Sequence, residues 1–432
     1  MSSVVKDDAA SGLLCSFEAK KMRRYVSLIV MGIVWTGCGL QETGERPKTD
    51  DVWIGPGYSV SEDGLEGEFR NKVWYVTGFD YPSGYDWRAD ADAGSVKCSL
   101  TVFANAVPML KVPVGEQHRT RPDPDMHRMI DGCLYTEYAA DSLTMIRRNG
   151  KPLFEYAGEE KIIGMLEDEG NIYTLGQAVS GNGFSYRVNG KKLVSRDRGY
   201  VFGHFVKDSA GHCFAFSEPI LSVSGEDERY YVCIGGKVSQ IAVREDVKKV
   251  WDVMFSGGKM YYIASLVGVD APVLVDGDHL AALELSSPLS IRSCRFIPGS
   301  TGPYIDVLID IQGFAYMSAI WKDGKFEKIF PLGSTVAAIC AEGDGIYAVL
   351  TSAGGTGGLI YRCGETFDMP EGYTILSTDA ISVVNGIMHV GLSSLTGGRP
   401  VIWRDGEMET LRLNGYIATV TSVQASHETV RD

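Results

Sequence analysis

The sequence predicts an all-β fold, a β-propeller built from four-stranded antiparallel blades. An apolar strand followed by a turn glycine occurs seven times, at intervals of 40 to 47 residues, which is the length of one four-stranded blade. A second family of tight turns precedes most copies by about twenty residues, so each repeat holds two hairpins. The 51 glycines and 21 tyrosines agree with this prediction, because tight turns and short strands need such residues.

Each copy of the first pattern is predicted to be a hairpin with a two-residue turn. An apolar residue stands four positions before the glycine, and Asn or Asp directly precedes most of these glycines, as in Ile320 to Gly324 (IWKDG). Asn-Gly and Asp-Gly favour such turns because both residues tolerate a positive φ. The turn glycines are Gly150, Gly190, Gly236, Gly277, Gly324, Gly364 and Gly406.

The second turn family opens a strand whose aromatic residue recurs in register, so we expect that ring to be buried between neighbouring sheets. In the last copy His389 takes the aromatic position. The copies are DGCLY (131–135), EGNIY (169–173), AGHCF (210–214), GGKMY (257–261), QGFAY (312–316), DGIY (344–347) and NGIMH (385–389).

The first blade is the divergent one, with its inner hairpin predicted at Lys72 to Thr77 and its outer hairpin at Leu100 to Val112. Including it gives eight blades, with seven as the alternative. Residues Tyr416 to Ser426 resemble the innermost strand of a blade, but no hairpin follows them. This C-terminal strand is therefore predicted to complete the first blade and close the ring. The alternative is that Tyr58 to Glu66 supplies that strand. Residues 53–432 are expected to form one domain.

The N-terminus is typical of an export signal. Basic residues at 20–24 precede the apolar run Tyr25 to Thr36, which is shorter than the about 20 residues that a spanning helix needs. The sequence Thr36-Gly37-Cys38 resembles the end of a bacterial lipoprotein signal, although Trp35 stands where that family has an aliphatic residue. The resemblance implies that residues 1–37 are removed, that Cys38 is lipidated, and that residues 38–52 form a flexible tether. A simple cleaved signal or an unmodified cysteine is the alternative, and Met22 is a candidate natural start.

Charge and cysteine content exclude several classes of partner. Removing residues 1–37 takes away five basic and three acidic groups, so the formal charge changes from -14 to -16. Such a surface repels nucleic acid and anionic lipid, and we expect contact with a membrane only through the lipid anchor. The seven cysteines after Cys38 show no zinc-binding spacing. We therefore predict no metal, no cofactor and mostly buried cysteines.

Alternating strand direction should divide the connections between the two faces of the ring. The tight turns described above are predicted to lie on one face, the tight-turn face, and the longer links on the other, the long-link face. These longer links are residues 78–94, 112–127, 217–228, 286–303, 351–358 and 392–400.

The first two long links flank the same blade, so their side chains are expected to be neighbours. Aromatic rings stack on the C–H faces of sugars, while carboxylates and guanidinium groups bond hydroxyls, so the pair predicts a ligand site. A solvated loop with its rings folded onto the first blade is the alternative, and calcium binding by Asp86, Asp90 and Asp92 lacks the regular spacing of a calcium loop. The candidate ligand-binding residues are Tyr81, Tyr85, Asp86, Trp87, Asp90, His118, Arg119, Arg121 and His127.

Motifs of catalysis are not found in the sequence. There is no GxSxG elbow, no HExxH, no P-loop and no GxGxxG after a strand, so no catalytic residue is assigned. The pair His118 and His127 is the one to consider as a base or a ligand. Arg147 and Arg187 are predicted to cover neighbouring blades with their stems while their heads reach water.

The repeat resembles that of β-propeller lipoproteins common in Bacteroides-type bacteria, over about residues 70–426. This resemblance implies an exported protein at the outer membrane or cell surface, with the periplasmic side as an alternative, and specifies no reaction. The first functional hypothesis is a non-enzymatic binding module for a glycan, a peptide or an envelope protein. A glycan hydrolase or lyase, with its site at the mouth of the central channel, is the second. A structural subunit with an apolar rim is the third, and the oligomeric state stays open.

Overall fold

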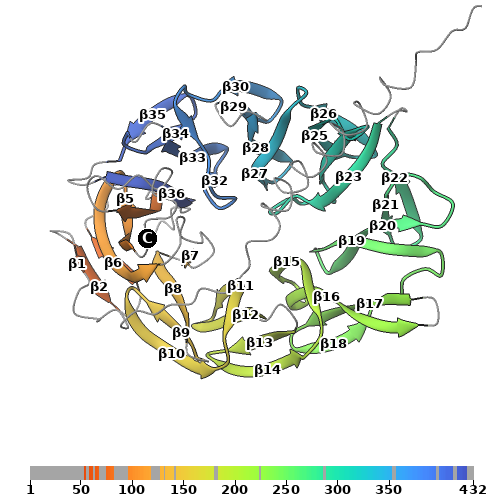
Figure 1. Cartoon of the computed structure of the whole chain (residues 1–432), viewed down its shortest axis with the longest axis horizontal. Helices are drawn as coiled ribbons and strands as arrows, with labels where there is room; N and C mark the ends of the chain where they lie inside the picture. Colours follow the sequence, from red (N-terminus) through yellow and green to blue (C-terminus); the bar gives the residue numbers. More distant parts are fainter. Residues whose placement is uncertain are drawn as a thin grey trace, which may run out of the picture. The chain divides into compact units, whose positions relative to one another are not determined.

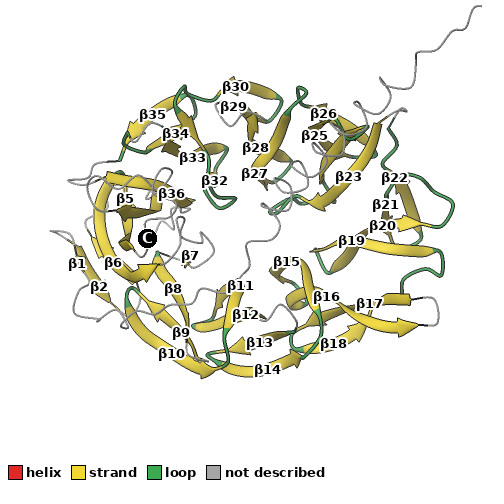
Figure 2. Cartoon of the chain, in the orientation of Figure 1, coloured by secondary structure: helices red, strands yellow, loops and turns green. Residues whose placement is uncertain are grey.

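The computed structural model describes residues 53–54, 58–61, 64–67, 74–81, 96–117, 127–130, 132–140, 143–179, 183–222, 225–285, 289–352, 357–395, 398–411 and 416–425. The predicted signal segment and tether, with Cys38, lie outside these ranges. The described strands belong to one compact unit, residues 40–178 and 182–432. Within the described ranges every regular element is a strand (Figure 2), and none is a helix that could cross a membrane.

The chain forms eight antiparallel blades in a ring (Figure 1), which confirms the predicted propeller and its blade number. In each blade the first strand lies nearest the centre and the fourth lies on the rim. Blades 2 to 4 contain β7 (His127–Ile130), β8 (Cys133–Ala140), β9 (Leu143–Arg148), β10 (Lys151–Ala157), β11 (Glu160–Asp168), β12 (Asn171–Ala178), β13 (Phe184–Val188), β14 (Lys191–Arg196), β15 (Tyr200–Asp208), β16 (Gly211–Ser222), β17 (Gly225–Ile234) and β18 (Lys237–Gln240).

Blades 5 to 8 repeat this order, with the short β31 (Tyr373–Thr374) beside β33 in the last. Their strands are β19 (Val247–Ser256), β20 (Lys259–Leu266), β21 (Val273–Asp276), β22 (His279–Ala282), β23 (Leu289–Phe296), β24 (Ile305–Ile311), β25 (Ala315–Lys322), β26 (Lys325–Ile329), β27 (Ser334–Glu342), β28 (Gly345–Ser352), β29 (Gly358–Arg362), β30 (Glu365–Asp368), β32 (Ile381–Val384), β33 (Ile387–Ser394), β34 (Val401–Arg404) and β35 (Glu407–Thr410).

Blade 1 joins the two ends of the described chain. Its strands are β4 (Trp74–Tyr81), β5 (Val96–Ala104), β6 (Val107–Gln117) and the C-terminal β36 (Tyr416–Ala425), with β1 (Trp53–Ile54) added at the outer edge. The strand β36 pairs antiparallel with β4 as the innermost strand, so the predicted C-terminal closure is confirmed. The alternative strand is instead a separate hairpin of β2 (Tyr58–Ser61) and β3 (Gly64–Gly67).

The repeat residues take the positions predicted for them. The turn residues Asn149, Asn189 and Asp323 have positive φ angles of 50°, 47° and 50°, as a tight hairpin requires. The apolar position is fully buried, as at Ile146 and Ile320, both 0% exposed. These side chains pack between neighbouring sheets, so each blade buries its two faces against the next blades.

Blade 6 contradicts part of the predicted division between faces. The turn at 312–314 joins β24 to β25, which places it on the long-link face, whereas the longer link 297–304 joins β23 to β24 on the tight-turn face. The predicted long link 286–303 was wrong, because residues 289–296 within it form strand β23. The aromatic position of this blade belongs to Tyr304, which is 5% exposed. The local pattern QGFAY fits a tight turn on either face, so it could not reveal the difference.

Two further expectations were wrong. The predicted link 217–228 continues the ladder of β16 and β17 as far as the pair Ser222 and Gly225, because the backbone groups of both strands keep finding partners. The head of Arg147 does not reach water, since Arg147 is only 7% exposed, and neither does the head of Arg187, which is 4% exposed. Its Nη2 donates to Glu160 Oε1 at 2.8 Å, and its guanidinium lies 3.8 Å from the ring centre of Tyr156. A desolvated cation needs such an anionic partner.

The innermost strands carry β-bulges, one of which is enlarged. Single-residue bulges occur in β11, β23 and β27. In β15 the register passes from Phe202 to Val206 while the partner strand advances only from Ala215 to Cys213. Gly203, with a φ of +74°, begins this excursion. A bulge changes the direction in which side chains point. In β15 it places His204 outside the regular strand pairing.

Candidate binding site

The two long links that flank blade 1 begin side by side. Strands β4 and β6 extend into the predicted links 78–94 and 112–127, so the links themselves are residues 82–95 and 118–126. Val96, the residue after the first link, pairs directly with Gln117, the residue before the second link. At the other end of the first link, the backbone of Tyr81 pairs with Tyr416. The links 82–95 and 118–126 therefore leave from the same end of the same sheet.

Most of the predicted ligand residues fall within these links and lie outside the described residues. These are Tyr85, Asp86, Trp87, Asp90, His118, Arg119 and Arg121. For Tyr81 only the backbone is described, at the last position of β4. The structure thus brings the bases of the two links together, and the ligand roles of these side chains stay a prediction.

His127, the last of the candidate residues, is described and lies in the interior. It begins β7 and is 2% exposed. Its Nε2 lies 2.9 Å from Thr77 Oγ1 and 2.7 Å from Thr421 Oγ1, and its ring meets the edge of Phe79 with centroids 5.7 Å apart. The imidazole therefore fixes the end of the second link against blade 1 and the C-terminal strand.

These contacts belong to a polar group that we call the closure cluster, made of Thr77, His127, Thr421 and Ser422. Thr77 Oγ1 also lies 2.5 Å from Ser422 Oγ. All four residues are buried. Beside the cluster, the neighbouring residue of β7, Arg128, donates to Asp379 of blade 8 at 3.1 Å. The C-terminal strand is thus held between blades on both sides.

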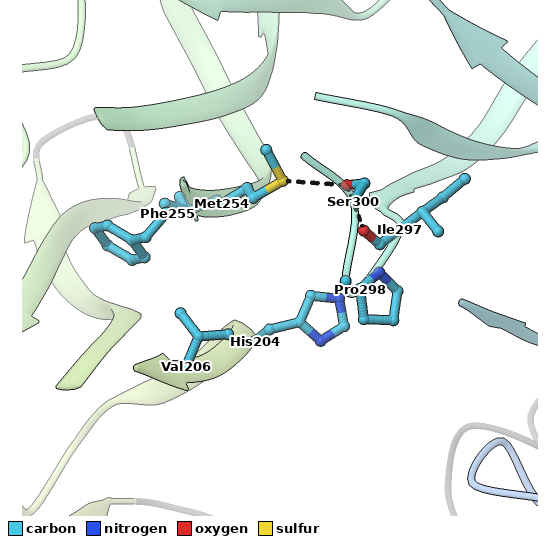
Figure 3. Close-up of a pocket in the computed structure, with 9 residues that line it drawn as sticks. His204, Val206, Met254, Phe255, Ile297, Pro298 and Ser300 are labelled. Carbon is cyan, nitrogen blue, oxygen red and sulfur yellow. Dashed lines mark hydrogen bonds between the residues drawn. The ribbon is translucent and has the colours of Figure 1, made fainter. Parts of the chain in front are cut away.

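A small pocket lies among the innermost strands of blades 4, 5 and 6 (Figure 3). Its volume is about 50 Å³, far below the 300–1,000 Å³ that drug-sized ligands occupy. A water molecule or a methyl group fits this space, but a sugar ring does not. The lining residues are His204, Val206, Val253, Met254, Phe255, Ile297, Pro298, Gly299 and Ser300.

Beside the pocket, a histidine and an aspartate hold one backbone unit. His204 Nε2 donates to the carbonyl oxygen of Phe296 at 3.2 Å, while Asp252 Oδ2 accepts from the Phe296 N–H at 2.7 Å. The other oxygen of Asp252 accepts from the Val253 N–H at 2.8 Å. Burial raises the pKa of Asp252, and its hydrogen bond from Phe296 opposes that rise. These contacts join the inner strands of three blades.

Ser300 and His204 line the pocket and are residue types that serve as a nucleophile and a general base in enzymes. The hydrogen bonds that would activate such a nucleophile are not formed between them. Ser300 Oγ donates to the Ile297 carbonyl at 2.8 Å, and no hydrogen bond between described residues joins it to His204 or Asp252. Nearby, Arg295 Nε donates to Asp306 Oδ2 at 2.9 Å. In the described ranges no three His, Cys, Asp or Glu side chains are placed to hold a metal ion. The pocket therefore shows no activated nucleophile.

Sequence reasoning missed the grouping of His204 and Asp252. The interval of 46 residues between Gly190 and Gly236 shows that blade 4 carries extra residues. It does not show that part of this excess lies in the innermost strand, because the longer hairpin of β16 and β17 adds length to the same interval. Only the register of β15 locates the bulge.

Comparison with known proteins shows similarity of fold at low sequence identity. No protein family and no curated protein matches the chain. A structure of AztD from Citrobacter koseri has a TM-score of 0.48 and 9% identity, covering 84% of this chain and 100% of that chain. The β-propeller domain of the Trilobed protease from Pyrococcus furiosus has a TM-score of 0.43 and 9% identity, covering 74% and 97%. An acylaminoacyl peptidase from Pyrococcus horikoshii has a TM-score of 0.43 and 7% identity, covering 76% of this chain and 57% of that chain.

Proposed function

We propose that this chain is an exported, lipid-anchored binding protein whose long-link face recognises a glycan. The observation that carries the proposal is the pairing of Val96 with Gln117. Since the links 82–95 and 118–126 start from adjacent strand ends, their aromatic, acidic and basic side chains can converge on one ligand. Loops of this kind on a rigid scaffold are common binding sites.

The chemistry of the links favours a sugar as the ligand. Tyr85 and Trp87 supply flat rings for stacking, and Asp86 with Arg119 supplies charged partners for hydroxyl groups. The pocket between blades 4 and 6, at about 50 Å³, cannot hold a sugar ring. We therefore place recognition on the long-link face rather than inside the ring.

A second candidate function is that of a glycan hydrolase or lyase. It is favoured by the grouping of the half-buried His204 with Asp252, a carboxyl whose pKa is raised by burial, because perturbed titratable groups often mark catalytic sites. However, both oxygens of Asp252 already accept backbone N–H groups. This arrangement holds the strands together and leaves binding as the first proposal.

The test compares variants of the chain from residue 38 onward, with Cys38→Ser to prevent lipidation. A glycan array and a thermal-shift screen are run on this protein, on its Tyr85→Ala/Trp87→Ala variant and on its Tyr200→Ala variant. Tyr200 is a matched control because it is an aromatic residue of blade 4 that is 48% exposed. We expect binding that is lost only in the double variant. Equal binding by all three folded proteins would overturn the proposed site.

The lipid anchor has its own test in the full chain. Cys38→Ala should move the protein from the membrane fraction to the soluble exported fraction. Retention of the Cys38→Ala protein in the membrane fraction would contradict anchoring through this residue.

A further inference from the structure

The long-link face carries a second group of exposed side chains, at the end of blade 6. Phe314 is 89% exposed, the highest value among the exposed large apolar side chains of the described residues. It ends the turn between β24 and β25, in which Gln312 and Gly313 have φ angles of 52° and 75°. Gly313 N donates to Asp310 Oδ1 at 2.7 Å, and Phe314 N donates to the Ile311 carbonyl at 3.0 Å. These bonds fix the turn, so the ring is presented on a rigid support.

A guanidinium group stacks on a second ring at the same end of the blade. The Cζ of Arg292 lies 5.4 Å from the ring centre of Tyr316, two residues along the chain from Phe314. Arg292 is exposed, and its N–H groups donate no hydrogen bond to another residue in the part of the chain that the structure describes. A stacked guanidinium keeps its planar donors available for a ligand.

An apolar side chain adjoins the two rings. Gly333 N donates to the Tyr316 carbonyl at 2.9 Å, which places the link between β26 and β27 beside the start of β25. Leu332 in this link is 64% exposed. Tyr316 connects these side chains, because Arg292 stacks on its ring, Phe314 precedes it by two residues, and Leu332 precedes the glycine that donates to its carbonyl. We call Arg292, Phe314, Tyr316 and Leu332 the blade 6 subsite.

We propose that the blade 6 subsite binds an acidic sugar residue, a uronic acid, within the glycan recognised by the long-link face. This inference rests on the proposed function, because the turn at 312–314 and the link 82–95 both join the second and third strands of their blades and so lie on the same face. Phe314 would stack on the C–H face of the sugar, and Arg292 would form paired hydrogen bonds with its carboxylate. A neutral sugar would leave the guanidinium without an anionic partner.

The experiment measures dissociation constants for uronic acid oligosaccharides from pectin and alginate and for the same oligosaccharides after reduction of their carboxyl groups to alcohols. The protein is the chain from residue 38 onward with Cys38→Ser. Arg292→Gln and Phe314→Ala test the subsite. The matched controls are Arg404→Gln, an exposed arginine at a tight turn, and Leu193→Ala, a 51% exposed side chain on an outer strand.

At about 0.15 M salt, which screens the long-range repulsion by the net negative charge of the chain, we expect the wild type to bind the acidic oligosaccharides more tightly than the reduced ones. Arg292→Gln should weaken binding of the acidic form about tenfold and leave the reduced form unchanged, whereas both controls match the wild type. If Tyr85→Ala/Trp87→Ala abolishes glycan binding while Arg292→Gln and Phe314→Ala do not alter it, the blade 6 subsite is wrong and the proposed function stands. If no glycan binds the wild type, the blade 6 subsite and the proposed glycan-binding function are both wrong.

Discussion

His127 Nε2 lies 2.7 Å from Thr421 Oγ1, although 294 residues separate the two in the sequence. The contact joins the first strand of blade 2, β7, to β36, the last of the described strands. Both residues are almost fully buried, at 2% and 3% exposure. Closure of the ring therefore depends on side-chain hydrogen bonds in the interior as well as on the pairing of β36 with β4.

His127→Ala should lower the free energy of unfolding by about 2–3 kcal/mol, because it removes the buried hydrogen bonds of Nε2 with Thr77 and Thr421 and leaves a cavity in the closure cluster. Urea unfolding of wild type and variant measures the change. Thr410→Val, at an exposed position of the outer strand β35, is the control and should be neutral. Equal unfolding midpoints for His127→Ala and Thr410→Val would show that the closure cluster contributes no stability.

Arg187→Met should destabilise the protein by about 3–5 kcal/mol, because it leaves the buried Glu160 carboxylate without its cation. The double variant Arg187→Met/Glu160→Met should recover part of this loss. Arg244→Met removes the exposed pair with Asp246 and should have no measurable effect. Urea unfolding tests all three, and an Arg187→Met protein as stable as wild type would contradict the role of the pair.

His389 should make stability depend on pH below neutrality. Burial, helped by the charge of Arg404, lowers its pKa from 6.5 to about 4. Between these values the unfolded chain binds a proton that the folded chain does not, so stability falls as the pH falls. The loss should reach about 3 kcal/mol and level off below pH about 4.

The His389→Phe variant isolates this contribution, since Phe214 occupies the same repeat position in blade 4. Urea unfolding at a series of pH values should give a flatter profile for the variant than for the wild type. Parallel profiles across the window would show that His389 does not cause the dependence.

Gly203→Ala should cost about 3 kcal/mol, because the added Cβ meets neighbouring atoms in a backbone conformation that already disfavours side chains. That Cβ would lie 2.7 Å from the Val253 carbonyl oxygen, at a φ of +74°. Gly277 has a φ of +57° and open space around the added carbon, so Gly277→Ala should cost only about 1 kcal/mol. Thermal unfolding of the two variants measures the difference in their stability. Equal losses of stability in Gly203→Ala and Gly277→Ala would show that the bulge in β15 is not closely packed against Val253.

The sequence by itself determined the architecture. Turn residues such as Asn189 and Gly190 act through their own backbone angles, and Ile320 recurs at a position that is always buried. Such features are local and repeat at each blade, so their spacing predicts hairpins, blade length and blade number. The C-terminal strand could be recognised because a strand without a following hairpin must pair elsewhere in the ring.

The tertiary structure alone decided which side chains meet between blades. The contact of His204 with Phe296 depends on a bulge in β15, and the exposure of Phe314 depends on which face its turn occupies. Neither is visible in a local pattern, because the same residues form the same turn on either face. Contacts across blades depend on register and on link length, which are set when the whole ring closes.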